Sequence, residues 1–165
     1  MRKTGFIAIV GRPNVGKSTL LNAMLGEKVA IVSAKPQTTR NRITGILTQG
    51  EDQFVFMDTP GIFDPKNSLG DFMVKAANAS MQDADAVILV ADTGREVTKV
   101  EEEVRAYLKR SGVPGILALS KTDLYNATQV AEAIMRYNAL HDFKAIVPIA
   151  ATKDGEMPFS VTICL

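Results

Sequence analysis

Short runs of apolar and β-branched residues recur along the chain between more polar segments, and they predict six strands. These runs are Gly5–Val10, Ile43–Thr48, Phe54–Asp58, Ala86–Ala91, Gly115–Ser120 and Ala145–Ile149. Apolar residues at helical spacing predict four helices between them, at Val15–Leu25, Leu69–Met81, Val97–Arg110 and Thr128–Leu140. Because strands and helices alternate, most connections are expected to be crossovers that build a parallel sheet.

The connection between the second and third predicted strands is different. Only the turn around Gly50-Glu51-Asp52 separates them, which is too short for a crossover, so they are expected to pair as an antiparallel hairpin at one edge. The predicted fold is therefore an α/β three-layer sandwich with a six-stranded, mostly parallel sheet and one antiparallel edge strand. Ligands of such sheets bind beyond the carboxyl ends of the strands.

Composition narrows the class of protein. The chain has 165 residues, 46% of them apolar and 22% charged, which suits one soluble domain with its own core. A net charge of +1 gives no global attraction to nucleic acid or to an anionic membrane, so membrane contact is expected to be at most peripheral. The chain is also expected to be a monomer. A single cysteine, Cys164, and the lack of a long apolar span or leader indicate a cytoplasmic protein.

Residues 11–18 read GRPNVGKS, which matches the phosphate-loop pattern G-x-x-x-x-G-K-[ST] between a predicted strand and a predicted helix. Glycines at both ends allow backbone N–H groups to turn towards an anion at a helix N-terminus. Lys17 is expected to reach the β- and γ-phosphates and Ser18 to ligate Mg²⁺. The expected nucleotide-binding residues here are Gly11, Arg12, Pro13, Asn14, Val15, Gly16, Lys17, Ser18 and Thr19. The alternative is a string that only caps a helix.

Two further segments could complete a metal and γ-phosphate site. Asp58 ends the third predicted strand, where its carboxylate is expected to hold Mg²⁺ through a water molecule, and Gly61 offers an N–H to the γ-phosphate. Such a contact exists only while the third phosphate is bound, which is typical of an order–disorder switch. Thr39 is expected to add a hydroxyl to the magnesium shell. A plain turn at Asp58–Gly61 and a threonine-rich strand entry around Thr39 are the alternatives.

Ser120-Lys121-Thr122-Asp123 follows the fifth predicted strand. Asp123 is expected to accept hydrogen bonds from N1–H and the 2-amino group of guanine, donors that adenine lacks at those positions. Lys121 is expected to lay its aliphatic stem over the base. This segment predicts a preference for guanine nucleotides.

Taken together, the strings Gly11–Ser18, Gln37–Arg40, Asp58–Gly61 and Ser120–Asp123 resemble the translation-factor-related GTPases, and most closely the Era family, over about residues 5–155. The resemblance implies a phosphate-loop NTPase that binds GTP and GDP, hydrolyses GTP with Mg²⁺ and switches between two states. It implies catalytic roles for Lys17, Thr39 and Gly61. It also implies a role in assembly of the small ribosomal subunit and contact with its rRNA.

The chain departs from the family pattern at three places. Ser120 stands where the family has an asparagine whose amide contacts guanine and joins the base motif to the phosphate loop. Because a hydroxyl reaches less far, nucleotide affinity is expected to fall by on the order of 1 kcal/mol per lost hydrogen bond, while Asp123 still selects guanine. Ala150 and Ala151 replace a serine-containing segment whose backbone N–H meets guanine. Residues 156–165 form an atypical tail, so a G domain over residues 1–155 is expected without its final helix and without the RNA-binding KH domain.

The residue after Gly61 is Ile62, where Ras-type GTPases have a glutamine that orients water. Catalysis must then rely on charge stabilisation, and Asn14 resembles the asparagine that binds K⁺ in related GTPases. The alternative is an asparagine that only shapes the loop. The function alternatives are a non-hydrolysing guanine-nucleotide module, an ATP-using phosphate-loop enzyme and a structural or nucleic-acid-binding protein.

Overall fold

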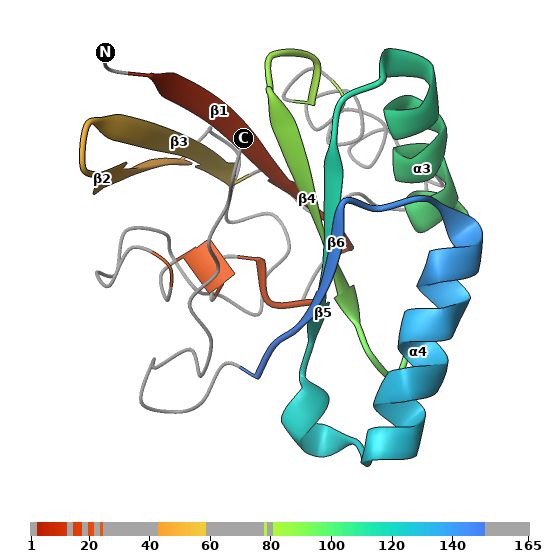
Figure 1. The fold of residues 1–165 in the computed structure, drawn as a ribbon. Coiled ribbons are helices and arrows are strands. Elements are labelled where there is room, and N and C mark those ends of the chain that lie inside the picture. Colours follow the sequence, from red (N-terminus) through yellow and green to blue (C-terminus); the bar gives the residue numbers. More distant parts are fainter. Residues whose placement is uncertain are drawn as a thin grey trace.

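A computed structural model describes residues 3–12, 15–17, 20–21, 24, 43–58, 78 and 81–150. Its centre is one six-stranded sheet with the strand order β2-β3-β1-β4-β5-β6 (Figure 1). The strands are β1 (Thr4–Val10), β2 (Ile43–Gln49), β3 (Asp52–Asp58), β4 (Ala86–Asp92), β5 (Gly115–Ser120) and β6 (Ala145–Pro148). All six strands predicted from the apolar runs are confirmed, with ends that differ by at most two residues.

The pairing directions are also as predicted. β2 and β3 pair antiparallel in the register Ile43↔Asp58 to Gln49↔Asp52, and every other neighbouring pair is parallel. Gly50 turns the hairpin with a φ of 63°, a left-handed conformation that glycine adopts without a Cβ penalty. The hairpin therefore places β2 at one edge, as its short connection required.

Two helices are described in full, α3 (Lys99–Ser111) and α4 (Ala127–Leu140), with the 3₁₀ turn η1 (Thr122–Leu124) after β5. Thr98 begins α3 with a capping box to Glu101, and Asn126 begins α4 with one to Gln129. Gly112 ends α3 in a left-handed conformation. These caps explain the starts of both helices and the end of α3, and all four ends lie within two residues of the predicted limits.

Only parts of the other two predicted helices can be compared. Lys17, Leu20, Leu21 and Met24 are helical, as are Asn78 and Met81. The remaining residues of Val15–Leu25 and Leu69–Met81 lie outside the described residues. So do residues 151–165, which include the predicted tail.

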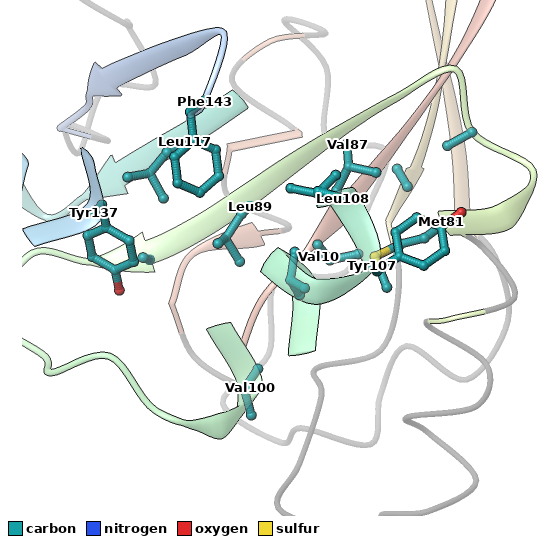
Figure 2. Packing of buried hydrophobic residues seen from close by; sticks show 14 of the residues in the cluster. Val10, Met81, Val87, Leu89, Val100, Tyr107, Leu108, Leu117, Tyr137 and Phe143 are labelled. Carbon is teal, nitrogen blue, oxygen red and sulfur yellow. The ribbon is translucent and has the colours of Figure 1, made fainter. Parts of the chain in front are cut away.

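The sheet is covered on both faces, which makes the molecule a three-layer sandwich. Figure 1 shows α3 and α4 on one side of the sheet, over β4, β5 and β6. Figure 2 shows the apolar cluster that these helices form with the sheet, which includes Val10, Met81, Val87, Leu89, Val100, Tyr107, Leu108, Leu117, Tyr137 and Phe143. A second cluster contains Ile7, Ile9, Val15, Leu20, Leu21, Phe56, Ala86, Ile88, Val90, Ala118 and Ile149. Alternate residues of β1 and β4 enter different clusters, so the central strands are buried from both sides.

The parallel strands end at one edge of the sheet, and the predicted motifs follow them there. The register pairs Ile9 with Asp58 and Asp92 with Ser120, so β1 and β3 end close together and β4 and β5 end together. Val10 pairs with Leu89, so β4 and β5 extend about three residues beyond the end of β1 at the same edge. In the described part of the chain, no helix has the length and apolar character needed to cross a membrane.

Candidate nucleotide-binding site

The two glycines of the phosphate loop meet different requirements. Gly11 lies against the neighbouring strand, because a Cβ built on it would lie 2.5 Å from the carbonyl oxygen of Val90. Gly16 has a φ of 101°, which side chains rarely tolerate, while a Cβ there would meet only Ser120 at 4.0 Å. Close approach therefore requires glycine at position 11, and backbone conformation requires it at position 16.

Lys17 lies inside the loop that it follows. Its ammonium donates to the carbonyl oxygen of Arg12 at 2.8 Å and to that of Gly11 at 3.2 Å, and the residue is buried. A buried ammonium held by backbone carbonyls is a fixed positive charge at the start of a helix. This is the charge that a phosphate chain requires.

Arg12 links the phosphate loop to α3. Its Nε donates to Oε1 of Glu101 at 2.7 Å, and its guanidinium also donates to the carbonyl oxygen of Glu96 at 3.2 Å. Glu101 is fully buried, and its Oε2 accepts from the N–H and the hydroxyl of Thr98. The Arg12 side chain thus takes a structural role, while its carbonyl contacts Lys17.

Ser120 connects the predicted base loop to the phosphate loop. Its hydroxyl donates to the carbonyl oxygen of Val15 at 2.7 Å, with that of Ala91 at 3.2 Å as a second acceptor. Its own carbonyl accepts from the hydroxyl and the N–H of Thr93. The link to the phosphate loop that serine was expected to weaken is present, because β5 ends close enough to Val15 for a short side chain to make the contact. The lower nucleotide affinity expected from serine at this position stays a prediction.

Asp92, at the end of β4, joins the same cluster, although no sequence motif indicated it. Its Oδ2 pairs with the Lys121 ammonium at 3.0 Å and with Nε of Arg95 at 3.6 Å, while its Oδ1 accepts from Gly94 N–H and the Tyr125 hydroxyl. Burial on its own raises the pKa of this carboxyl, but the Gly94 N–H, Lys121 and Tyr125 together outweigh burial and lower that pKa. Asp92 is therefore a buried, ionised carboxylate beside the base loop.

Lys121 and Asp123, in the base loop after β5, were both predicted to contact the base. The backbone of Lys121 adopts the left-handed conformation, with a φ of 59°, and this residue immediately precedes η1. Asp123 lies in the first turn of η1, and its carboxylate is exposed. The structure leaves its oxygens open to an approaching ligand.

The end of β6 lies against this loop. The carbonyl oxygen of Ile149 accepts from the hydroxyl and the N–H of Thr122, and the N–H of Ile149 donates to the carbonyl of Leu119. Ala150 follows directly, which brings it to the same edge as Asp123.

The expected metal and γ-phosphate residues fall mostly outside the described part of the chain. Asp58 occupies the last position of β3, level with Ile9, which is the strand-end position predicted for it. The predicted residues that are not described are Pro13, Asn14, Ser18, Thr19, Thr39, Gly61 and Ala151. Within the described ranges, no group of three or more His, Cys, Asp or Glu side chains could hold a metal ion. The hydroxyl ligands proposed for Mg²⁺, Ser18 and Thr39, both belong to the residues that are not described.

The fold and the site define a class of protein. A six-stranded sheet with one antiparallel edge strand, a glycine loop after β1 with a buried lysine, and an Asp-bearing loop after β5 are typical of phosphate-loop GTPases. The chain belongs to the family of 50S ribosome-binding GTPases, whose model matches residues 6–121.

Curated relatives in this family are similar over most of the chain. GTPase Era from Clostridium kluyveri is 47% identical over 153 residues, which is 93% of this chain and 52% of that protein. GTPase Era from Clostridium botulinum is 49% identical over the same coverage. The chain thus spans about half the length of the curated relatives it matches.

Solved structures support the same assignment. A variant of Era from Aquifex aeolicus bound to GDP and AlF4⁻ matches with a TM-score of 0.80 and 41% identity, over 90% of this chain and 52% of that one. Era in complex with MgGDPNP and nucleotides 1506–1542 of 16S ribosomal RNA matches with a TM-score of 0.82 and 36% identity, over 100% of this chain and 60% of that one.

Proposed function

We propose that this chain binds GTP and GDP at the carboxyl edge of its sheet and hydrolyses GTP to GDP and phosphate. The observation that carries the proposal is the bond from the Ser120 hydroxyl to the Val15 carbonyl, 2.7 Å long, because it joins a base-recognition loop to a phosphate loop. A nucleotide that spans both loops meets one preformed site. The Era structures described above, which hold GDP with AlF4⁻ or MgGDPNP, support the same interpretation.

In this proposal the phosphate loop and its metal ligands carry the chemistry. A water oxygen attacks the γ-phosphorus, the bond to the β–γ bridging oxygen breaks, and that oxygen leaves with the electron pair on GDP. The phosphate formed keeps one proton of the water, and the other passes to solvent. Lys17 stabilises charge on the β- and γ-phosphates, and Gly61 contacts the γ-phosphate. Mg²⁺ would be held by Ser18 and Thr39 and, through water, by Asp58, residues whose hydroxyl and carboxylate oxygens suit this cation.

The remaining proposed roles concern a K⁺ site and recognition of the guanine base. Asn14 would ligate a K⁺ ion that adds a second positive charge near the transferred phosphoryl group. Asp123 would accept from guanine and Lys121 would cover the base, with Ala150 and the Ala151 N–H beside guanine O6. The exposed Asp123 carboxylate and the position of Ala150 at the same edge support this assignment.

The wider role is proposed from the relatives. The Era complex with 16S ribosomal RNA supports a place for this chain in small-subunit assembly in the cytoplasm, as the nucleotide-switched part, over residues 1–155, of a protein that contacts rRNA. In that setting GTP binding and hydrolysis would time association with the subunit. A monomer is the proposed state, and membrane contact would be at most peripheral.

Phosphate release tests the enzymatic part of the proposal. The chain is expected to release phosphate from GTP in the presence of Mg²⁺, and Lys17→Ala is expected to lower the rate by roughly 100-fold or more because the fixed charge at the phosphates is lost. Lys144→Ala, which removes an exposed lysine at the opposite edge, should leave the rate unchanged. Turnover that is the same in NaCl and KCl would refute the potassium site alone.

A second outcome separates the main alternative. If the chain binds GDP but releases no phosphate above the Lys17→Ala background in either salt, it is a non-hydrolysing guanine-nucleotide module. The chain would then lack GTPase activity, while its base and phosphate loops would still bind the guanine nucleotide.

A further inference from the structure

We infer that Asp92 is the positioning residue of the base-recognition lysine: its carboxylate holds the Lys121 ammonium, so that the aliphatic stem of Lys121 is presented to the guanine ring. The inference rests on the proposed function and deepens it, because it assigns part of the base affinity to a residue on a neighbouring strand. Asp92 does not touch the nucleotide in this account. It acts through Lys121.

The first support is the placement of the pair. Asp92 ends β4 directly beside Ser120 of β5, so the next residue of the β5 loop, Lys121, emerges within reach of its carboxylate. The Nζ to Oδ2 distance is 3.0 Å. The Asp92 side chain is 6% exposed and that of Lys121 is 36% exposed, so the anchor lies inside the protein while part of the lysine side chain is accessible to a ligand.

The second support is that Asp92 is itself held in place. The Gly94 N–H donates to its Oδ1 at 3.0 Å and the Tyr125 hydroxyl at 3.3 Å. The Tyr125 ring packs so closely on Gly94 that a Cβ there would overlap the phenol. Because the loop after β4 and the loop after β5 both contact this carboxylate, its position does not depend on one of them alone.

The third support comes from the backbone of Lys121. Its φ of 59° places it in the left-handed region, and its carbonyl accepts from the Leu124 N–H to start η1. Lysine otherwise has a long stem with several free rotations. With the backbone set by η1 and the ammonium set by Asp92, both ends of the side chain are restrained before a base arrives. Preorganisation of this kind reduces the ordering cost of binding.

A double-mutant cycle on GDP affinity, measured by titration calorimetry with the 165-residue chain, tests the inference. Asp92→Asn keeps the size of the side chain and removes its charge, and it is expected to weaken GDP binding roughly fivefold, as fits the ordering of one long side chain. In the Lys121→Met background the same change should have no further effect, because no ammonium remains to be positioned. Asp52→Asn, on the exposed hairpin, is the matched control and should leave affinity unchanged.

A structural role for Asp92 would give a different result. If Asp92→Asn weakens GDP binding by the same factor in the wild-type and the Lys121→Met backgrounds, or has no effect in either, the inference is overturned. Tyr125→Phe removes one hydrogen bond from Asp92 without altering charge, and it provides a second cycle should Asp92→Asn fail to fold. It is expected to weaken binding about twofold, and only when Lys121 is present.

The same experiment distinguishes this inference from the proposed function. A wild-type chain that binds no GDP overturns the proposed function and the inference with it. A wild-type chain that binds GDP, with additive effects in both cycles, overturns the inference alone.

Discussion

The Ser120 hydroxyl has one hydrogen and two carbonyl oxygens within reach. The Val15 oxygen at 2.7 Å is closer than the Ala91 oxygen at 3.2 Å, so the donated bond goes mainly to the phosphate loop. Because Ser120 is 6% exposed, water cannot readily replace this bond. The buried Ser120 hydroxyl therefore links the base loop after β5 to the phosphate loop.

Ser120→Ala is expected to leave the Val15 carbonyl without its short partner and to loosen the phosphate loop relative to the base loop. An unpaired buried acceptor costs about 1–3 kcal/mol, so GDP affinity should fall roughly five- to tenfold or more. Calorimetric titration measures the affinity, and denaturant unfolding of the same sample separates it from a change in stability. Ser111→Ala, at the exposed end of α3, is the matched control. An unchanged GDP affinity in Ser120→Ala would show that this bond does not link the loops.

Some site residues could be predicted from sequence and others could not. Gly11, Gly16 and Lys17 belong to a contiguous pattern whose spacing carries its own chemistry, so the sequence indicated them directly. Asp92 lies 29 residues from Lys121, and the two meet only because β4 and β5 are neighbours in register. The reach of Ser120 likewise depends on how close β5 ends to Val15, which no motif specifies.

Helix α4 contributes a buried polar atom that the core does not satisfy. Tyr137 is 0% exposed in the cluster of Figure 2, and among the described residues its hydroxyl has no hydrogen-bond partner. Burial, followed by the negative charge of Glu101, raises the pKa of Tyr137 to about 12. The ring stabilises the packing of α4 on the sheet. Without a partner among the described residues, the hydroxyl adds no hydrogen bond to that packing.

Tyr137→Phe is expected to keep or slightly increase the free energy of unfolding at about pH 8, because no hydrogen bond is lost. The pH dependence should also change. With a folded pKa of about 12 above the unfolded value of 10.0, the wild-type contribution is complete below pH 10.0 and is lost as the pH rises towards about 12. Between about pH 8 and about pH 11 the wild type should lose about 1 kcal/mol more than the variant, measured by urea unfolding. A loss above about 1 kcal/mol at pH 8 in the variant would mean that the hydroxyl has a partner.

At the scale of elements, sequence pattern predicted more than at the scale of residues. Strand and helix periods identified the six strands and both fully described helices, because apolar burial on a pleated or helical surface repeats locally. The exact start of α3 depends on the Thr98–Glu101 capping box. The spacing of these two residues is visible in the sequence and could have predicted where the helix starts. That the same Glu101 also pairs with Arg12 follows from the packing of α3 beside the phosphate loop, which local pattern does not contain.

The whole molecule brings together, at one edge of one sheet, loops that are far apart in the chain. The phosphate loop follows β1, the Asp92 cluster follows β4, the base loop follows β5 and Ala150 follows β6, and side-chain bonds connect the first three. This connection explains how one guanine nucleotide could contact them all. A site of this arrangement is expected to bind guanine nucleotides in preference to adenine nucleotides.

Competition for a fluorescent GDP analogue measures that preference most directly. With the full chain in Mg²⁺, unlabelled GTP and GDP are expected to displace the analogue at concentrations roughly 100-fold or more below those needed with ATP. The physical reason is that adenine leaves the Asp123 carboxylate without its two donors, a mismatch that costs on the order of 10⁴-fold where such an acceptor is desolvated by the base. Displacement by ATP as effective as by GTP would contradict the account and indicate an ATP-using phosphate-loop protein.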